Sequence, residues 1–381
     1  MFSSDDLIEA AKRESGLTSF GGDSYREGLE ILVASLRDEA NLTPVGENFL
    51  KGRLLNRLVS RLQIEEWYTG CPETEEVPIT APLFGLGLPR TGSTALSFLL
   101  AQDPDIRYLR MWEALRPFPP PSTVAGSDPR LTAPNDWALP AVTKHVPMDA
   151  TGPMADMEIL ALDFKTVSYY GSARMSTYTD WLRDADLTSA YLYQRRTLKM
   201  LQWGEPPRPW RLKMPAHMLW LDYLINAFPD ARFVMTHRDP TDVMLSVCSM
   251  IAEMQSAFTA EVDLLEIGRS NLLQWTTGIQ RVMNYRDEFG DARFYDIDFR
   301  AMRADPIGEI KRLYAWLGEP VSPEFDRRMR DWWTQNSANR EPRGSSDPIP
   351  FGLDLDEIRA SFAEYVRRAE RWTDHSRSLT K

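Results

Sequence analysis

The pattern of apolar and polar positions predicts helices at the start of the chain and alternating strands and helices later. Apolar residues recur at helical spacing within residues 5–68, as in Leu29 and Leu32. Residues 154–203 show the same helical character and carry many aromatic side chains. Residues 117–135 are rich in proline, serine and aspartate, which predicts an irregular segment between the helical regions.

Four apolar runs predict buried strands, and each is followed by a helical pattern. The runs are residues 82–88, 210–214, 231–236 and 292–297. Strands that alternate with helices form a parallel sheet with helices on both faces. The predicted fold is therefore α/β: a P-loop-like three-layer sandwich, with a central parallel sheet flanked by helices and a helical N-terminal extension. We expect residues 1–75 to form this extension, packed on the core, and residues 76–381 to form the α/β domain of what is one structural domain overall.

Composition narrows the class of protein. The chain of 381 residues is 43% hydrophobic and 26% charged, as in ordinary globular proteins. Its net charge of −11 argues against general binding to nucleic acid or to an anionic membrane. Two cysteines exclude a disulfide framework, and four scattered histidines give little support to a metal site. We expect no secretory signal, no membrane span and a cytoplasmic location.

The loop after the first apolar run has the composition of a phosphate-binding turn. A strand, a glycine-containing loop and a helix N-terminus together present unpaired backbone N–H groups to an anion. Gly92 permits a tight turn, and Thr91, Ser93 and Thr94 add hydroxyl donors. Arg90 adds a permanent cation with a planar donor fork. The alternative is a strand–helix turn that binds nothing.

This loop departs from the nucleoside triphosphate loop at one position. Gly87 and Gly92 have the spacing of that motif, but Ser93 stands where its lysine is needed. That lysine reaches the β- and γ-phosphates of the nucleotide. The sequence therefore predicts a site for a compact phosphate group and not for a magnesium-bound triphosphate.

A second candidate anion site follows the third run. Arg238 comes at the strand exit, Asp239 is a suitable helix cap, and Pro240 suits the first helical position. Ser246 lies about two turns into this helix. Arg238 and Ser246 could bind one phosphate from two sides. The alternative is that Arg238 pairs with a nearby aspartate and Ser246 is a neutral helix residue.

Taken together, these segments resemble the sulfotransferases that use 3′-phosphoadenosine 5′-phosphosulfate (PAPS), in particular the broad bacterial group. Residues 87–94 resemble the loop that binds the 5′-phosphosulfate, and residues 233–240 with Ser246 resemble the element that binds the 3′-phosphate. Further similarity is seen in residues 111–113, 212–217 and 351–353, within a resemblance that spans roughly residues 80–365.

The resemblance implies roles for individual residues. Arg90 to Thr94 would hold the 5′-phosphate and the departing sulfonate, and Arg238 and Ser246 the 3′-phosphate. Arg343 lies in a segment that resembles the basic C-terminal stretch of the family, which also reaches the 3′-phosphate. Cytosolic members commonly have lysine where Arg90 stands, so a role that needs a neutral amine is lost here.

Sulfonate transfer depends on in-line positioning and on cations at the breaking bond. Arg90 and Lys213 are the candidate cations, and no metal is required. Glu113, His217 and His145 are the candidate general bases, because the acceptor hydroxyl needs a base within hydrogen-bond reach.

The acceptor is expected to be a small molecule with a hydroxyl or amine, of hydrophobic or aromatic character. The aromatic residues of 164–203, with Trp332 and Trp333, either line its pocket or belong to the core. The sequence is compatible with a homodimer and does not decide the oligomeric state. The alternative functions are a P-loop-type kinase or NTPase, and a nucleotide-binding domain without activity; the absence of a G-x-S-x-G motif argues against an esterase.

Overall fold

The centre of the molecule is a parallel sheet. The computed structural model describes residues 2–133, 143, 148–336 and 347–380. Within these ranges the sheet has five strands in the order β2-β3-β1-β4-β5, and every neighbouring pair is parallel. The strands are β1 (Leu83–Leu86), β2 (Arg107–Tyr108), β3 (Trp210–Lys213), β4 (Arg232–His237) and β5 (Phe294–Asp298).

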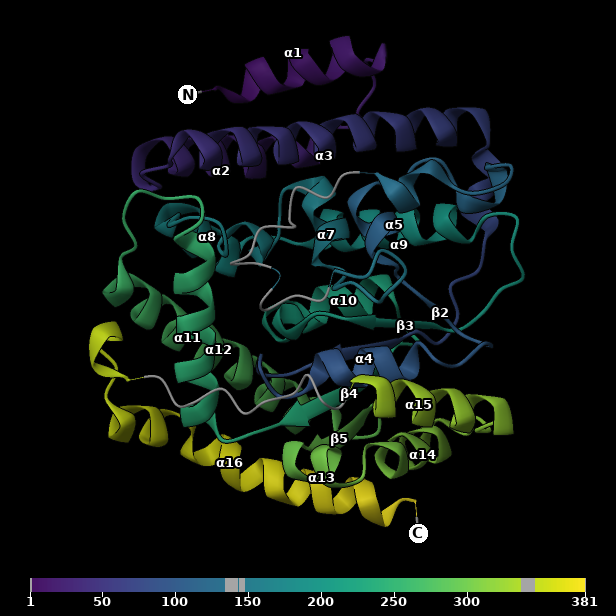
Figure 1. Ribbon diagram of the computed structural model, residues 1–381, viewed down its shortest axis with the longest axis vertical. Coiled ribbons are helices and arrows are strands. Elements are labelled where there is room, and N and C mark those ends of the chain that lie inside the picture. Colours follow the sequence, from purple (N-terminus) through teal and green to yellow (C-terminus); the bar gives the residue numbers. More distant parts are fainter. Residues whose placement is uncertain (1, 134–142, 144–147, 337–346, 381) are drawn as a thin grey trace.

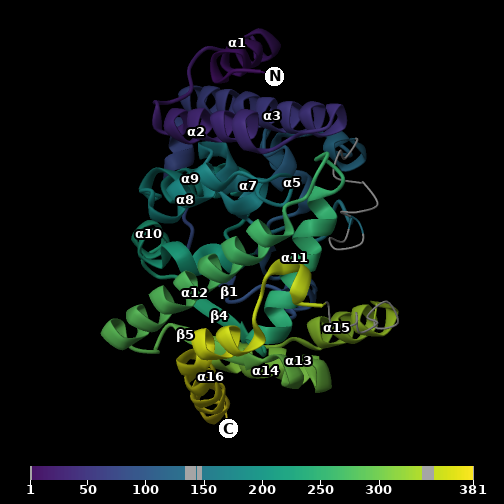
Figure 2. The same cartoon turned by 90° about the vertical axis from the view of Figure 1, so that its left-hand side faces the viewer.

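Helices enclose the sheet on both faces (Figure 1). In chain order the α-helices are α1 (Ser4–Ser15), α2 (Ser24–Glu39), α3 (Pro44–Gly70), α4 (Ser93–Leu100), α5 (Met111–Leu115), α7 (Met157–Leu160), α8 (Ser176–Asp184), α9 (Thr188–Gln202), α10 (Leu221–Ala227), α11 (Pro240–Gln255), α12 (Leu264–Phe289), α13 (Phe299–Ala304), α14 (Pro306–Leu317), α15 (Pro323–Asn336) and α16 (Leu355–Ser378). The helices α1 to α3 lie at one end of the molecule and α16 lies at the other (Figure 1 and Figure 2).

Alternation along the strands separates two apolar layers. Successive strand residues point to opposite faces of a sheet. Leu83 and Tyr295 face a core formed with α4, α14 and α15. Phe84 and Phe294 face the larger core, which includes α10, α11, α12 and the N-terminal helices. The strands are therefore buried on both sides, as the predicted three-layer sandwich requires.

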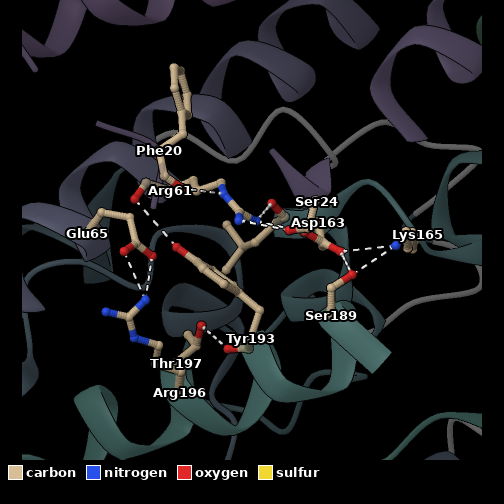
Figure 3. Close-up of polar contacts among 11 residues, drawn as sticks. Phe20, Ser24, Arg61, Glu65, Asp163, Lys165, Ser189, Tyr193, Arg196 and Thr197 are labelled. Carbon is tan, nitrogen blue, oxygen red and sulfur yellow. Dashed lines mark hydrogen bonds and ion pairs between the residues drawn. The ribbon is translucent and has the colours of Figure 1, made fainter. Parts of the chain in front are cut away.

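Charged side chains on one face of α3 join the N-terminal helices to the middle of the chain. Arg61 Nη1 lies 2.8 Å from Asp163 Oδ1, and both side chains are buried (Figure 3). Nearer the start of α3, Arg53 and Arg57 bind the buried Glu158 at 2.8 and 2.7 Å. Because removing one partner would leave a buried charge uncompensated, these pairs fix α3 against the segment around α7.

Most of the elements agree with the sequence pattern. The strands β3, β4 and β5 begin and end within two residues of the predicted runs. The strand β2 is not predicted by the sequence pattern, because two residues are too few to show an alternation. In the described part of the chain, no helix combines the length and the apolar character needed to traverse a bilayer.

Candidate functional site

The loop between β1 and α4 is held in an unusual backbone conformation. Gly87, Arg90 and Gly92 all have positive φ, at 121°, 62° and 88°. The Thr91 hydroxyl donates to the Leu88 carbonyl at 2.8 Å and lies 2.6 Å from the Thr236 hydroxyl of β4. Thr91 is buried, so its side chain stabilises the loop and leaves its backbone N–H as the group that could face an anion.

The first turn of α4 is the part of this loop that is open to a ligand. Gly92 is the N-cap, and no side chain caps the helix. Ser93 is half-buried and Thr94 is exposed. The hydroxyl groups of these two residues and the backbone N–H groups of the first turn can therefore bind a phosphate or sulfonate oxygen.

The two candidate anion sites converge, although 148 positions of chain separate them. Arg238 Nη1 donates a hydrogen bond to the backbone carbonyl of Arg90 at 3.0 Å. The Arg90 side chain in turn donates from Nε to the Ser246 hydroxyl on α11, also at 3.0 Å. Arg238 also pairs with Asp242 at 3.1 Å, as the alternative interpretation of this arginine expects, and its guanidinium lies 4.7 Å from the centre of the Phe299 ring.

A cavity of about 230 Å³ opens beside the phosphate loop. Pro89 and Thr94 of the loop segment and Lys213 at the end of β3 form part of its wall. The remaining wall is contributed mainly by α5, α7, α11 and α12 and the segments next to them. Most of the lining side chains are apolar, which suits an apolar acceptor next to the loop.

Lys213 is the cation on the wall of this cavity. Burial lowers the pKa of its ammonium group below the usual 10.5, although the charge of Asp156 opposes the shift. The backbone carbonyl of Lys213 accepts a hydrogen bond from the backbone N–H of Asp156 at 3.3 Å. Among the described residues, no side chain is within hydrogen-bond distance of the ammonium, so it can turn toward a ligand.

Glu113 occupies a different environment from the one expected of a general base. It is fully buried and accepts hydrogen bonds from Arg107 and from the backbone N–H of Arg110. Arg110 Nη2 lies 3.0 Å from its Oε1. Glu113 is not on the cavity wall. These contacts favour a structural role, because the carboxylate is already neutralised by two guanidinium groups.

His217 is also fully buried. Its Nε2 lies 2.9 Å from Asp156 Oδ2 and its Nδ1 lies 2.8 Å from the Tyr191 hydroxyl. Its side chain does not line the cavity; it contacts Asp156, whose backbone N–H bonds the Lys213 carbonyl, and its own backbone N–H bonds the carbonyl of Met214 on the wall. The remaining candidates, His145 and Arg343, lie outside the described residues.

The aromatic residues of 164–203 belong mostly to the core. Tyr169, Tyr178 and Tyr191 are fully buried there. Trp332 stacks on Phe98 in the smaller core, and of this aromatic set Tyr170 lines the cavity. Seven methionines also line the cavity, and the sequence gives no sign of this because they come from distant segments of the chain.

A parallel α/β fold whose first strand leads through a glycine-containing loop into an open helix N-terminus is typical of P-loop-like proteins. The model of the Sulfotransferase family matches residues 82–323, and the chain belongs to this family. In the described residues, no cluster of histidine, cysteine or carboxylate side chains is arranged to hold a metal ion.

Two solved sulfotransferase structures are similar to this protein over nearly the whole chain. The crystal structure of sulfotransferase STF9 from Mycobacterium avium is 34% identical, covers 97% of each chain and has a TM-score of 0.88. That of sulfotransferase STF1 from Mycobacterium tuberculosis H37Rv is 30% identical, covers 95% of this chain and 99% of its own, and has a TM-score of 0.80. The predicted fold class is thereby confirmed, including the N-terminal helices that precede the family match.

A curated relative matches over a shorter stretch. It is the omega-hydroxy-beta-dihydromenaquinone-9 sulfotransferase Stf3 of Mycobacterium tuberculosis, which is 26% identical over 108 residues. This match spans only 28% of the length of each protein.

Proposed function

We propose that the protein transfers the sulfonate group of PAPS to the hydroxyl of a small apolar acceptor. The observation that carries this proposal is the hydrogen bond from Arg238 to the Arg90 carbonyl, which brings a second anion-binding element to the phosphate loop. A nucleotide with phosphate groups at both its 5′ and 3′ positions is the kind of donor that needs both elements. Membership of the sulfotransferase family supports this choice of donor.

In this proposal the donor lies across the two elements. The N–H groups of the first turn of α4, with Ser93 and Thr94, hold the 5′-phosphate and the sulfonate. Arg238 and Ser246 hold the 3′-phosphate. Arg90 extends from the loop to Ser246 and so lies between the two phosphate positions, where its charge serves both. Arg343 stays a predicted further contact to the 3′-phosphate.

The chemical step is an in-line displacement at sulfur. The acceptor oxygen forms a bond to sulfur while the bond from sulfur to the 5′-phosphate oxygen breaks, and the hydroxyl proton passes to water at the exposed loop. The products are the sulfate ester and 3′-phosphoadenosine 5′-phosphate (PAP). Negative charge grows on the leaving phosphate oxygen, so Lys213 on the cavity wall and Arg90 in the loop stabilise the transition state. Glu113 and His217, the predicted bases, act in this account by holding Arg107, Arg110 and Asp156 in place.

The location we propose is the cytoplasm. The two cysteines, Cys71 and Cys248, are both free thiols, which suits a reducing compartment.

Calorimetric titration with PAP, adenosine 5′-phosphate and ATP tests the proposed donor. We expect PAP to bind at least tenfold more tightly than adenosine 5′-phosphate, because only PAP engages both elements. ATP that binds more tightly than PAP in the presence of Mg²⁺ would instead favour a kinase or NTPase. Tight binding of PAP without transfer to any acceptor would favour the alternative that the protein is a nucleotide-binding domain without catalytic activity.

A further inference from the structure

Methionine is the most frequent residue in the wall of the cavity beside the phosphate loop. Seven of the chain's 16 methionines line it, and they come from four separate stretches of sequence. They are Met111, Met148, Met154, Met157, Met214, Met250 and Met254. Two aromatic residues, Tyr170 and Trp275, share the described wall with them.

Most polar side chains of this wall are engaged by protein partners. Glu158 is bound by Arg53 and Arg57, the Tyr170 hydroxyl donates to Glu266 at 3.1 Å, and Asn271 donates to a backbone carbonyl at 2.8 Å. Within the described ranges, Gln274 on α12 is a polar wall residue whose side chain has no hydrogen-bond partner in the protein. Thr94 and Lys213 are better placed than Gln274 to bind a reacting hydroxyl, because they lie at the phosphate loop.

Methionine makes a wall that adapts to its ligand. Its side chain is unbranched, has three rotatable bonds and carries a polarisable thioether, so it can repack around a flexible chain. A planar ring is instead recognised by flat surfaces on its two faces, which two aromatic residues in a wall of methionines do not supply.

The methionine wall continues to the donor site. Met250 lines the cavity, and its sulfur lies 3.9 Å from Arg90 Nη1. Ser246, Met250 and Met254 follow at four-residue spacing on α11, so one face of this helix runs from the proposed 3′-phosphate site into the cavity. An apolar chain on this wall would place its polar end next to Arg90.

We infer that the acceptor is a flexible aliphatic alcohol, whose hydrocarbon chain packs on the methionine wall and whose terminal hydroxyl meets Lys213 and Thr94. This inference rests on the proposed function, and it names the class of acceptor. Burial of one methylene group contributes about 0.8 kcal/mol, which corresponds to about a fourfold change in kcat/KM.

The first experiment measures transfer from radiolabelled PAPS to the straight-chain primary alcohols from butanol to dodecanol, with 2-naphthol and glucose for comparison. We expect kcat/KM to rise about threefold to fourfold per added methylene until the cavity is filled. A flat dependence on chain length, or higher kcat/KM for 2-naphthol or glucose than for every alkanol, would overturn the inference. In either case transfer itself still occurs, so the proposed sulfonate transfer from PAPS would stand and only the class of acceptor would change.

The second experiment does not depend on turnover. In the complex with PAP, isotope-labelled methionine methyl groups are followed by NMR while decanol is added. We expect the resonances of the wall methionines to shift and those of the other methionines to stay in place. Met157→Leu identifies a wall resonance, and Met283→Leu, on α12 but outside the cavity, is the matched control. Wall resonances that do not respond to decanol would contradict the inference even if PAP binds.

A specificity variant completes the test. Met154→Ile combined with Met157→Ile replaces two unbranched wall side chains by stiff β-branched ones. We expect kcat/KM for decanol to fall about tenfold relative to butanol, with unchanged affinity for PAP and unchanged thermal stability. Met283→Ile should leave the ratio of decanol to butanol as in the wild type. Loss of affinity for PAP in the double variant would show a general disturbance of the site and would count against a specificity role.

Discussion

Arg238 donates a hydrogen bond to the backbone carbonyl of Arg90 at 3.0 Å, and this contact joins the exit of β4 to the loop after β1. The two strands are neighbours in the sheet, with Leu86 opposite Met235. Because the carboxyl ends of parallel strands lie at one edge of a sheet, the loops that follow them meet there. The geometry explains how two short segments far apart in the sequence can bind one ligand.

Deprotonation of Lys213 is expected to lower kcat at high pH. Since burial lowers the pKa of its ammonium group, the group loses its proton at a lower pH than an exposed lysine does. The protonated form stabilises the leaving group, so kcat should fall as pH rises through this lowered pKa. Lys213→Met should reduce kcat by about 10²–10³ with little change in affinity for PAP.

The matched variant is Lys213→Arg, which keeps a charge that is not lost at any accessible pH. It should retain part of the activity and lose the decline at high pH. If kcat of Lys213→Arg fell at the same high pH as kcat of the wild type, the titrating group would be a residue other than Lys213.

The phosphate loop should not tolerate a side chain at Gly92. The residue has φ 88°, and an added Cβ would lie 3.3 Å from the Phe299 ring. Gly92→Ala should therefore lower the free energy of unfolding by about 1–3 kcal/mol and weaken the binding of PAP. The control is Gly52→Ala, in the exposed part of α3, where nothing lies within 4 Å of the added Cβ. That variant should be neutral or slightly stabilising and should bind PAP normally. Equal behaviour of the two variants in thermal unfolding would contradict the prediction.

The ion pairs of α3 are expected to matter for folding. Burial raises the pKa of Glu158, but Arg53 and Arg57 outweigh this effect and hold it below the usual 4.5. Glu158→Gln would leave two buried guanidinium groups without a countercharge, which should lower the free energy of unfolding by about 3–5 kcal/mol. Asp38→Asn, which removes the exposed partner of Arg37, should have no measurable effect. Denaturant unfolding of both variants distinguishes them, and a Glu158→Gln protein as stable as the wild type would show that the ion pairs of Glu158 do not hold α3 in place.

The sequence predicts the sheet and the phosphate loop because both depend on local features. Strand periodicity and the order of residues from Arg90 to Thr94 are visible in a single stretch of chain. The environments of Glu113 and His217 are not, since Arg107, Asp156 and Tyr191 reach them through tertiary packing.

The methionine wall is likewise not predictable from the sequence, because tertiary packing forms it. Met111, Met157, Met214 and Met250 are more than thirty positions apart, and only the fold brings them together. Sequence spacing indicates chemistry when neighbours along the chain form the site, as in the phosphate loop. It gives no such indication when the site is an inner surface built from several helices.

Binding of the 3′-phosphate by Arg238 is tested by the ratio of the PAP and adenosine 5′-phosphate dissociation constants, measured by calorimetry in the wild type and in Arg238→Ala. If Arg238 binds the 3′-phosphate, the variant should lose a charge-assisted contact of about 1.5–3 kcal/mol, and the wild-type preference for PAP should fall by about tenfold to a hundredfold. Affinity for adenosine 5′-phosphate should change little. An unchanged preference for PAP in a folded Arg238→Ala protein would contradict the account.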